Sequence, residues 1–439
     1  EQPFWALILL ASVLGQIGLP GGGYTFGYGS TGGMGNAPPL FRPPSMSAGR
    51  NPTNYAIPAA RIADALLNPG EIFDYNGKKI TYPNIQMIYW AGGNPFHHHQ
   101  DLNRLRLGWQ RPETVIVHEP WWTATARHAD IVLPATTSLE RNDFGSAARD
   151  PYLVVMEKAI DPVGQSKNDF DILVELAKRL GCEKEFTEGR DEDAWLRFLY
   201  DSCRDGAKTN EAAMPDFDAF WEKGWFKIPD REDEYTLFSD FREDPKVNRL
   251  KTRSGKFELY SRKIEKFGYD DCPPHVTWME PAEWLGSPKT KDYPLHLMSS
   301  QPKDRLHSQM DGGPVSAASK VAGREPVEIN PLDALKRGIN SGDVVRIFNG
   351  RGQCLAGAVI NDNIRQNVIR LSAGAWYDSD NGEPGCLEIH GNPNVLTRDY
   401  GTSKIGQAPT STTALVEIEK FEESAPALNI SSPPQQVAL

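Results

Sequence analysis

Residues 85–119 read IQMIYWAGGNPFHHHQDLNRLRLGWQRPETVIVHE, and this stretch decides the fold class. The apolar run 85–92 is typical of a buried strand, 101–111 has the periodicity of a helix, and 114–119 is a second apolar strand. Short, almost uninterrupted apolar strands that alternate with helices indicate a parallel, doubly wound sheet. The sequence therefore predicts an α/β fold of the dinucleotide-binding type.

The flanking sequence continues this alternation. A helical pattern at 56–70 precedes it, and a third apolar strand, ADIVLPAT, occupies 129–136. We assign residues 1–160 to this α/β domain. Ligands bind such sheets at the carboxyl ends of the strands, so polar residues at these ends are candidates for a binding site.

The predicted secondary structure changes after residue 160 and again after residue 287. We interpret 161–287 as a mixed helical, linking segment packed on the sheet, with a clear helix at 169–181 closed by Gly181. Residues 288–422 contain several strands with turn signals and predict a C-terminal β-barrel domain. This region has one short helix at 330–338, with Asn330 as the N-cap. The Pro- and Ser-rich tail 423–439 is expected to be extended.

Composition excludes several classes of protein. With 47 basic and 58 acidic residues the formal charge is -11, which argues against nucleic acid as a partner because phosphate binding needs clustered cations. The five cysteines form no C-x-x-C pair, so we expect mostly buried free thiols and neither a zinc ribbon nor a cysteine-held cluster. The apolar run 4–18 is too short to span a membrane, and we interpret it as a buried helix ended by LPGGG. No basic region precedes this run, so we expect it not to be a signal peptide and the chain to be the C-terminal portion of a longer protein.

The histidines at 97, 98 and 99 allow three interpretations: a metal site, a nucleotide site or a polar turn. Adjacent side chains on a helix or strand diverge, so His97, His98 and His99 cannot converge on one ion. A turn that leads from a strand into a helix offers imidazoles and backbone N–H groups to a phosphate or a nucleotide edge. The residues alone leave the nucleotide site and the solvated turn open.

Other polar residues are equivocal one by one. Carboxylates such as Glu119, Asp143 and Asp169 could receive ribose hydroxyls or guanine N–H donors, and Arg141, Lys303 and Arg305 could hold a pyrophosphate. A surface carboxylate or a solvated salt bridge is the more common explanation of such residues taken one by one. The polar loops 301–311 and 390–404 could bind a ligand or be turns. The chain has no G-x-G-x-x-G in the right place and no P-loop, which argues against an ordinary NAD or ATP site.

Five stretches, in this order, resemble the C-terminal half of the dimethyl sulfoxide and trimethylamine N-oxide reductases. They are WAGGNPFHHHQDLNRL, ETVIVHEPWWTATARHADIVLPATTSLERND, GYDDCPPHVTWMEP, SSQPKDRLHSQMDGG and NPNVLTRDYGTSK. The resemblance runs through essentially all of residues 1 to about 422. It implies molybdenum bound by two molybdopterin guanine dinucleotides (bis-MGD), and it favours a nucleotide over a metal as the ligand of the histidines.

By resemblance, eighteen residues would contact this cofactor. They are Asn94, His98, His118, Glu119, Arg141, Asp169, Ser300, Gln301, Pro302, Lys303, Arg305, His307, Ser308, Gln309, Asn394, Ser411, Thr412 and Thr413. In the family the serine ligand of the metal and the residues beside the substrate lie in the N-terminal half. No residue of this chain is therefore assigned as catalytic or as a metal ligand.

The resemblance implies a reductase that removes oxygen from an S-oxide or N-oxide, in which Mo(IV) takes the oxygen atom and is restored by two electrons and two protons. We expect this chain alone to be inactive without the N-terminal half. Biotin or methionine sulfoxide reduction, formate oxidation and a non-catalytic nucleotide-binding remnant are the alternatives. A cytochrome or quinol-linked electron donor, a role in anaerobic respiration and a periplasmic location are expectations from the family, with the cytoplasm as the alternative.

Overall fold

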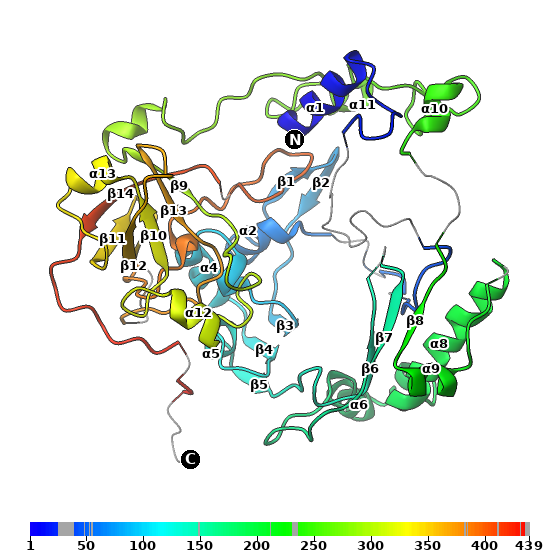
Figure 1. Cartoon of the computed structure of the whole chain (residues 1–439). Helices are drawn as coiled ribbons and strands as arrows, with labels where there is room; N and C mark the ends of the chain where they lie inside the picture. Colours follow the sequence, from blue (N-terminus) through cyan, green and yellow to red (C-terminus); the bar gives the residue numbers. More distant parts are fainter. Residues whose placement is uncertain are drawn as a thin grey trace. The chain divides into compact units, whose positions relative to one another are not determined.

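The computed structural model describes residues 1–24, 39–47, 49–51, 53, 56–147, 150–210, 212–230, 236–381, 383, 385–410, 412–430 and 432–434. The chain divides into two compact units by its internal contacts, and Figure 1 labels their helices and strands. The first comprises Glu1, Ala56–Val132 and Arg262–Leu439, and the second comprises Gln2–Tyr55 and Leu133–Ser261. The domain boundaries predicted from the sequence stay a prediction.

The predicted parallel strands are present. Strand β3 (Met87–Ala91) pairs in parallel with β4 (Thr114–His118), from Met87 opposite Thr114 to Ala91 opposite His118, and β5 (Ile131–Leu133) follows in the sheet order. Helices α3 (Pro95–His98) and α4 (Leu102–Trp109) connect β3 to β4. The helical prediction for 101–111 and the small parallel sheet are confirmed, and among the described residues this sheet has three strands.

Two elements precede this sheet. The helix predicted at 56–70 is a 3-10 turn, η1 (Ala59–Arg61), followed by α2 (Ile62–Leu67). Helix α2 packs closely on α4, because a Cβ added to Gly108 would lie 3.2 Å from the Cβ of Leu66. The hairpin of β1 (Ile72–Tyr75) and β2 (Lys78–Thr81) was not predicted, although Asn76 and Gly77, with φ of 48° and 78°, form the turn.

The predicted C-terminal barrel is confirmed as a closed barrel of six strands in the order β10-β12-β11-β14-β9-β13. The strands are β9 (Leu295–Met298), β10 (Pro326–Ile329), β11 (Val344–Phe348), β12 (Gln353–Ile360), β13 (Val368–Leu371) and β14 (Ala414–Lys420). Alternate residues such as Val345 and Ile347 have no exposed surface and fill the interior. Helix α13 (Pro331–Leu335) begins at Asn330, whose side chain accepts a hydrogen bond from the Leu332 N–H at 3.0 Å, as predicted.

Glu283 ties the barrel to the segment that precedes it. Its side chain is 2 % exposed and pairs with both Nη atoms of Arg351, at 2.6 and 2.9 Å. It also accepts the backbone N–H of Leu415 on β14 at 3.0 Å. Burial raises the pKa of Glu283, but the hydrogen bonds from Arg351 and Leu415 and the charges of Arg351 and Lys289 outweigh burial and lower the pKa to about 2.

We expect this carboxylate to make the stability of the barrel depend on acid pH. Because the pKa is lowered from 4.5 in the unfolded chain to about 2, the stabilisation is complete above pH 4.5 and is lost as the pH falls toward 2. The loss amounts to roughly 3 kcal/mol. Urea unfolding at pH 2 to 6 should show this acid dependence in the wild type and in Glu280→Gln, an exposed control. An equally steep dependence in Glu283→Gln would contradict this assignment.

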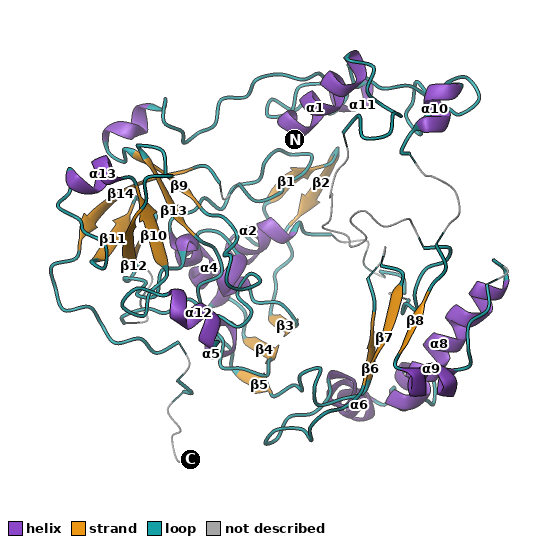
Figure 2. Cartoon of the chain, viewed as in Figure 1, coloured by secondary structure: helices purple, strands orange, loops and turns teal. Residues whose placement is uncertain are grey.

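The second unit has an antiparallel sheet of β6 (Asp143–Gly145), β7 (Tyr152–Met156) and β8 (Trp225–Lys227). Its helices are α1 (Gln2–Val13), α6 (Asp169–Leu180), α7 (Glu183–Thr187), α8 (Glu192–Lys208), α9 (Phe217–Lys223) and α10 (Ser239–Glu243) (Figure 2). Tyr200 and Phe220 stack in its core with ring centroids 4.7 Å apart. The helix predicted at 169–181 is confirmed, and Gly181 ends it with φ of 72°.

The interpretation of 4–18 as a buried helix is wrong in two respects. Helix α1 ends at Val13, and among its described residues only Ala11 is buried, while Leu10 and Val13 are 55 % and 77 % exposed. An apolar sequence predicts a helix, but it does not guarantee enough neighbouring surface to bury every face.

The remaining helical elements of the first unit are short. They are α5 (Ala124–Arg127), α11 (Arg262–Glu265), η2 (Pro288–Lys291), α12 (Pro314–Ser319) and η3 (Pro393–Val395). All five cysteines are free, and three of them are buried, as predicted. Within the described ranges, every helix is too short or too polar to cross a bilayer.

Candidate functional site

Asn94 lies at the carboxyl end of β3, where the chain turns into α3. Asn94 is 8 % exposed, and its Oδ1 accepts a hydrogen bond from Thr125 on α5. Its Nδ2, and both ring nitrogens of His97, are buried without a hydrogen-bond partner among the described residues. Since buried donors and acceptors are normally paired, these atoms are places where a polar ligand could complete the hydrogen bonding.

His118 and Glu119 follow the end of the neighbouring strand β4. The His118 Nε2 lies 2.7 Å from the hydroxyl of Tyr89 on β3, so this nitrogen already has a protein partner. Burial raises the pKa of Glu119 to about 7, although a hydrogen bond from Thr123 at 3.1 Å opposes this effect. The parallel register places both residues beside the turn that carries Asn94.

The α3 turn and the β9 loop are joined through Trp376, whose ring stacks on His97 with centroids 5.3 Å apart and whose indole donates to the backbone oxygen of Ser308 at 2.8 Å. The pKa of His98 is lowered by burial first, then by the charges of His99 and His307. His307 lies in the loop that follows β9 and has a left-handed backbone, with φ of 53°. The structure therefore brings the α3 turn and the β9 loop to one place, while their predicted contact with a cofactor stays a prediction.

The β9 loop carries eight of the predicted residues. Gln301, Lys303, His307 and Gln309 are exposed, while the buried Oγ of Ser300 has no partner among the described residues. Ser308 accepts a hydrogen bond from the Trp376 indole at 2.8 Å through its backbone oxygen, and Pro302 is half-buried. Arg305 differs from its neighbours, because its side chain is only 1 % exposed.

Asn394 is held by the protein itself. Its Nδ2 donates to the backbone oxygen of His97 at 3.1 Å, and its Oδ1 accepts from Thr397 at 3.1 Å. Thr412 and Thr413 precede β14, which pairs with β9, so they lie beside the start of the β9 loop. Ser411 lies outside the described residues.

Arg141 and Asp169 belong to the second unit. Arg141 lines a cavity of about 680 Å³ in that unit, together with Lys158, Asp171 and Glu192. Asp169 is the first residue of α6, at the helix end that favours negative charge.

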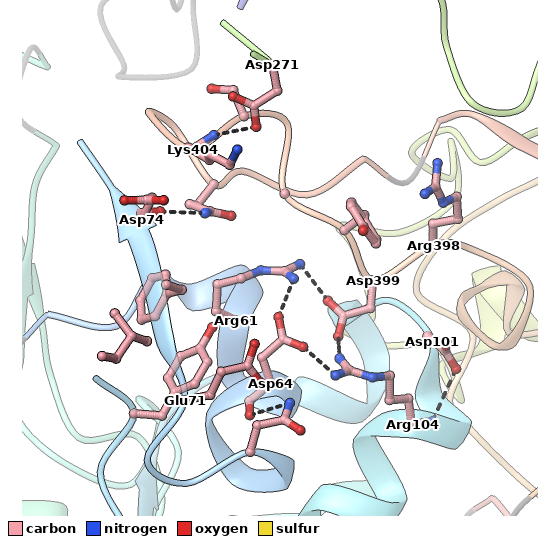
Figure 3. Close-up of a pocket in the computed structure, with 18 of the residues that line it drawn as sticks. Arg61, Asp64, Glu71, Asp74, Asp101, Arg104, Asp271, Arg398, Asp399 and Lys404 are labelled. Carbon is pink, nitrogen blue, oxygen red and sulfur yellow. Dashed lines mark hydrogen bonds and ion pairs between the residues drawn. The ribbon is translucent and has the colours of Figure 1, made fainter. Parts of the chain in front are cut away.

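The first unit contains a charged cavity of about 670 Å³ that the sequence did not reveal. Arg61 and Arg104 point toward Asp64 and Asp399 and form a closed set of ion pairs at its wall (Figure 3). Asp399 lies five residues after Asn394, and its carboxylate is 2.9 Å from Arg61 and 2.8 Å from Arg104. His99, next to His98, lies 3.7 Å from the same carboxylate.

These residues fit the polar parts of a dinucleotide cofactor better than they fit a metal ion. The unpaired Asn94 Nδ2 and Ser300 Oγ are hydrogen-bonding groups, and the exposed Lys303 offers a cation for phosphate. Among the described residues, no group of three His, Cys, Asp or Glu side chains is arranged to hold a metal.

Comparison with known proteins gives two family matches. The Molybdopterin oxidoreductase family matches residues 1–179, and the Molydopterin dinucleotide binding domain matches residues 295–415. The second match covers the β9 loop and the barrel strands from β9 to β13, together with the start of β14, while the first covers the parallel sheet.

Three curated relatives are similar over nearly the whole chain. A biotin sulfoxide reductase of Cereibacter sphaeroides is 49 % identical over 95 % of this chain and 56 % of its own length. A dimethyl sulfoxide/trimethylamine N-oxide reductase of the same organism is 46 % identical over 99 % of this chain and 54 % of its own length. A trimethylamine-N-oxide reductase of Haemophilus influenzae is 46 % identical over the whole chain and 55 % of its own length. The chain thus spans about half the length of these relatives.

Among solved structures, acetylene hydratase from Pelobacter acetylenicus is similar with a TM-score of 0.60 and 21 % identity. The likeness covers 77 % of this chain and 45 % of the hydratase, and it supports the fold alone.

Proposed function

Because the chain belongs to the dimethyl sulfoxide/trimethylamine N-oxide reductase family of molybdopterin oxidoreductases, we propose that it is the cofactor-binding part of a molybdenum reductase. The complete enzyme removes oxygen from an S-oxide or an N-oxide. The observation that carries this proposal is the 46 % identity to such reductases across nearly the whole chain. The proposed cofactor is molybdenum with two molybdopterin guanine dinucleotides.

The chain's own residues would bind and orient this group. The Asn94 Nδ2 would donate a hydrogen bond at the end of β3, and the Ser300 Oγ would complete a second one at the end of β9. In the first unit, Lys303 and His98 would face anionic parts of the cofactor. Arg141 and Asp169, taken by themselves in the second unit, stay candidates for binding a guanine. The bound cofactor supplies the two-electron chemistry of oxygen removal, and the protein supplies its position.

The type of sheet to which the parallel strands belong is part of the same proposal. We propose that the strands β3, β4 and β5 are part of a doubly wound, dinucleotide-binding sheet, and the similarity to acetylene hydratase supports this arrangement. The electron donor, proposed to be a cytochrome or a quinol-linked protein, and the proposed periplasmic location rest on the family alone.

Biotin sulfoxide is the second candidate substrate, because a biotin sulfoxide reductase is 49 % identical. The test is a comparison of dimethyl sulfoxide, trimethylamine N-oxide and biotin sulfoxide, using the longest native form of the protein and a chemically reduced dye as electron donor. Reduction of at least one of these compounds is expected. Molybdenum-loaded protein that reduces none of these compounds would overturn the proposal. Reductase activity from residues 1–439 alone would contradict the proposal that this chain only binds the cofactor.

A further inference from the structure

Arg305 belongs to a buried, charge-balanced group that we call the Arg305 cluster: Arg305, Asp311, Lys320 and Glu325. The four side chains are between 0 % and 5 % exposed. Lys320 lies 2.7 Å from Asp311 and 2.6 Å from Glu325, and Arg305 lies 3.3 and 3.2 Å from the same two carboxylates. Two cations and two anions cancel, so the cluster has no unbalanced positive charge to offer a phosphate.

The guanidinium of Arg305 also donates to backbone atoms of the β9 loop and of the neighbouring segment. The Nε donates to the backbone oxygen of His307 at 3.1 Å, and an Nη donates to that of Ala373 at 3.1 Å. The other Nη donates to the Ser316 hydroxyl at 3.3 Å. His307 has a left-handed backbone that is unfavourable for a residue with a Cβ, so this conformation needs support from its surroundings.

Asp311 connects the Arg305 cluster to the α3 turn through Trp376. Its carboxylate accepts the backbone N–H of Trp376 at 3.0 Å, and the Trp376 indole donates to the backbone oxygen of Ser308 at 2.8 Å. The ring of Trp376 stacks on His97, with centroids 5.3 Å apart. The Arg305 cluster therefore connects the β9 loop with the turn that carries Asn94 and His98.

We propose that Arg305 and Glu325 are positioning residues that hold the β9 loop in its binding conformation, and that Arg305 is not itself a ligand of the cofactor phosphate. This inference rests on the proposed function, because it says which residues fix the conformation of the loop that is proposed to bind the cofactor. It replaces the direct contact that the sequence predicted for Arg305.

The two roles of Arg305 give opposite results when Glu325 is changed. If Arg305 binds phosphate directly, Glu325→Gln releases the guanidinium from a competing carboxylate and leaves the retained guanine unchanged or increased. If Arg305 acts by position, Glu325→Gln disorders the β9 loop and lowers the amount of retained guanine. Such a loss cannot come from a lost contact between Glu325 and the cofactor, because a glutamate does not attract an anion. Arg305→Lys keeps the charge but cannot make the same set of hydrogen bonds, and it should have the same effect.

The experiment uses the full-length protein and two measurements: hydrogen exchange of the backbone amides of residues 300–311, and guanine released by acid per chain. We expect exchange to become more than about tenfold faster in Glu325→Gln and in Arg305→Lys, with less guanine retained. Glu328→Gln is the matched control, because Glu328 pairs with Arg370 on the same barrel but lies outside the cluster. It should behave like the wild type.

Wild-type exchange together with wild-type guanine content in Glu325→Gln would overturn the proposal. If that variant does not fold, Arg305→Lys decides by the same two measurements. A wild-type protein without guanine would count against the proposed function, whereas the exchange rates would still decide whether the Arg305 cluster holds the loop.

Discussion

Glu388→Ala is expected to lower the free energy of unfolding of the barrel-containing unit by more than about 4 kcal/mol. Glu388 has no exposed surface, and its carboxylate accepts four backbone N–H groups. Two of them, from Gly391 and Asn392, lie at 2.8 and 2.9 Å. Alanine would leave all four donors buried and unpaired, and each unpaired donor costs about 1–3 kcal/mol.

Two further variants make this prediction specific. Glu388→Gln keeps one oxygen and should have an intermediate stability, because its amide group cannot accept from the other donors. Glu383→Ala removes an exposed glutamate of the same loop and should change the stability by less than about 0.5 kcal/mol. Urea denaturation of the three variants is the measurement. A Glu388→Ala protein as stable as Glu383→Ala would contradict the role assigned to the carboxylate.

The second large effect is expected for Asp399→Ala, with a loss of about 3–5 kcal/mol. The Asp399 side chain is 1 % exposed and pairs with Arg61, at 2.9 Å, and with Arg104, at 2.8 Å. Without this carboxylate, the buried guanidinium of Arg61, whose side chain is 8 % exposed, loses one of its two anionic partners. The substitution also breaks the link that Asp399 makes to Arg61 at the end of η1 and to Arg104 on α4 (Figure 3).

Asp270→Ala is the control for Asp399→Ala. Asp270 pairs with Lys404 at 2.6 Å, but its side chain is 85 % exposed, so its removal should leave the stability essentially unchanged. Thermal and urea unfolding of the two variants should therefore separate clearly. Equal stabilities would show that the ion pairs at the cavity wall do not hold α2, α4 and the loop together.

Local sequence signals predicted the elements that depend on local physics. The apolar runs gave β3 and β4, and the Gly181 cap and the Asn330 cap gave the ends of α6 and α13. The hairpin of β1 and β2 was missed although its Asn76-Gly77 turn was visible in the sequence. That turn is a strong hairpin signal, so local chemistry alone accounts for this hairpin and no long-range contact is needed to explain it.

The site could be predicted only in part, because its organisation comes from contacts distant in the sequence. The resemblance predicted binding residues at the ends of β3, β4 and β9, and the structure brings Asn394 within hydrogen-bond distance of the α3 turn at His97. No local pattern indicates that Arg61 meets Asp399, 338 residues away, or that Glu388 gathers four backbone donors. These buried polar groups depend on the tertiary fold, and their partners cannot be read from spacing.

The metal and nucleotide content of the longest native form of this protein tests directly whether the chain is part of a molybdenum reductase. Molybdenum is measured by mass spectrometry, and guanine is measured after acid release. We predict about one molybdenum and about two guanines per full-length chain, as expected for a reductase with two molybdopterin guanine dinucleotides. Protein without molybdenum and without guanine, purified from cells that make the cofactor, would contradict the account and favour a non-catalytic role.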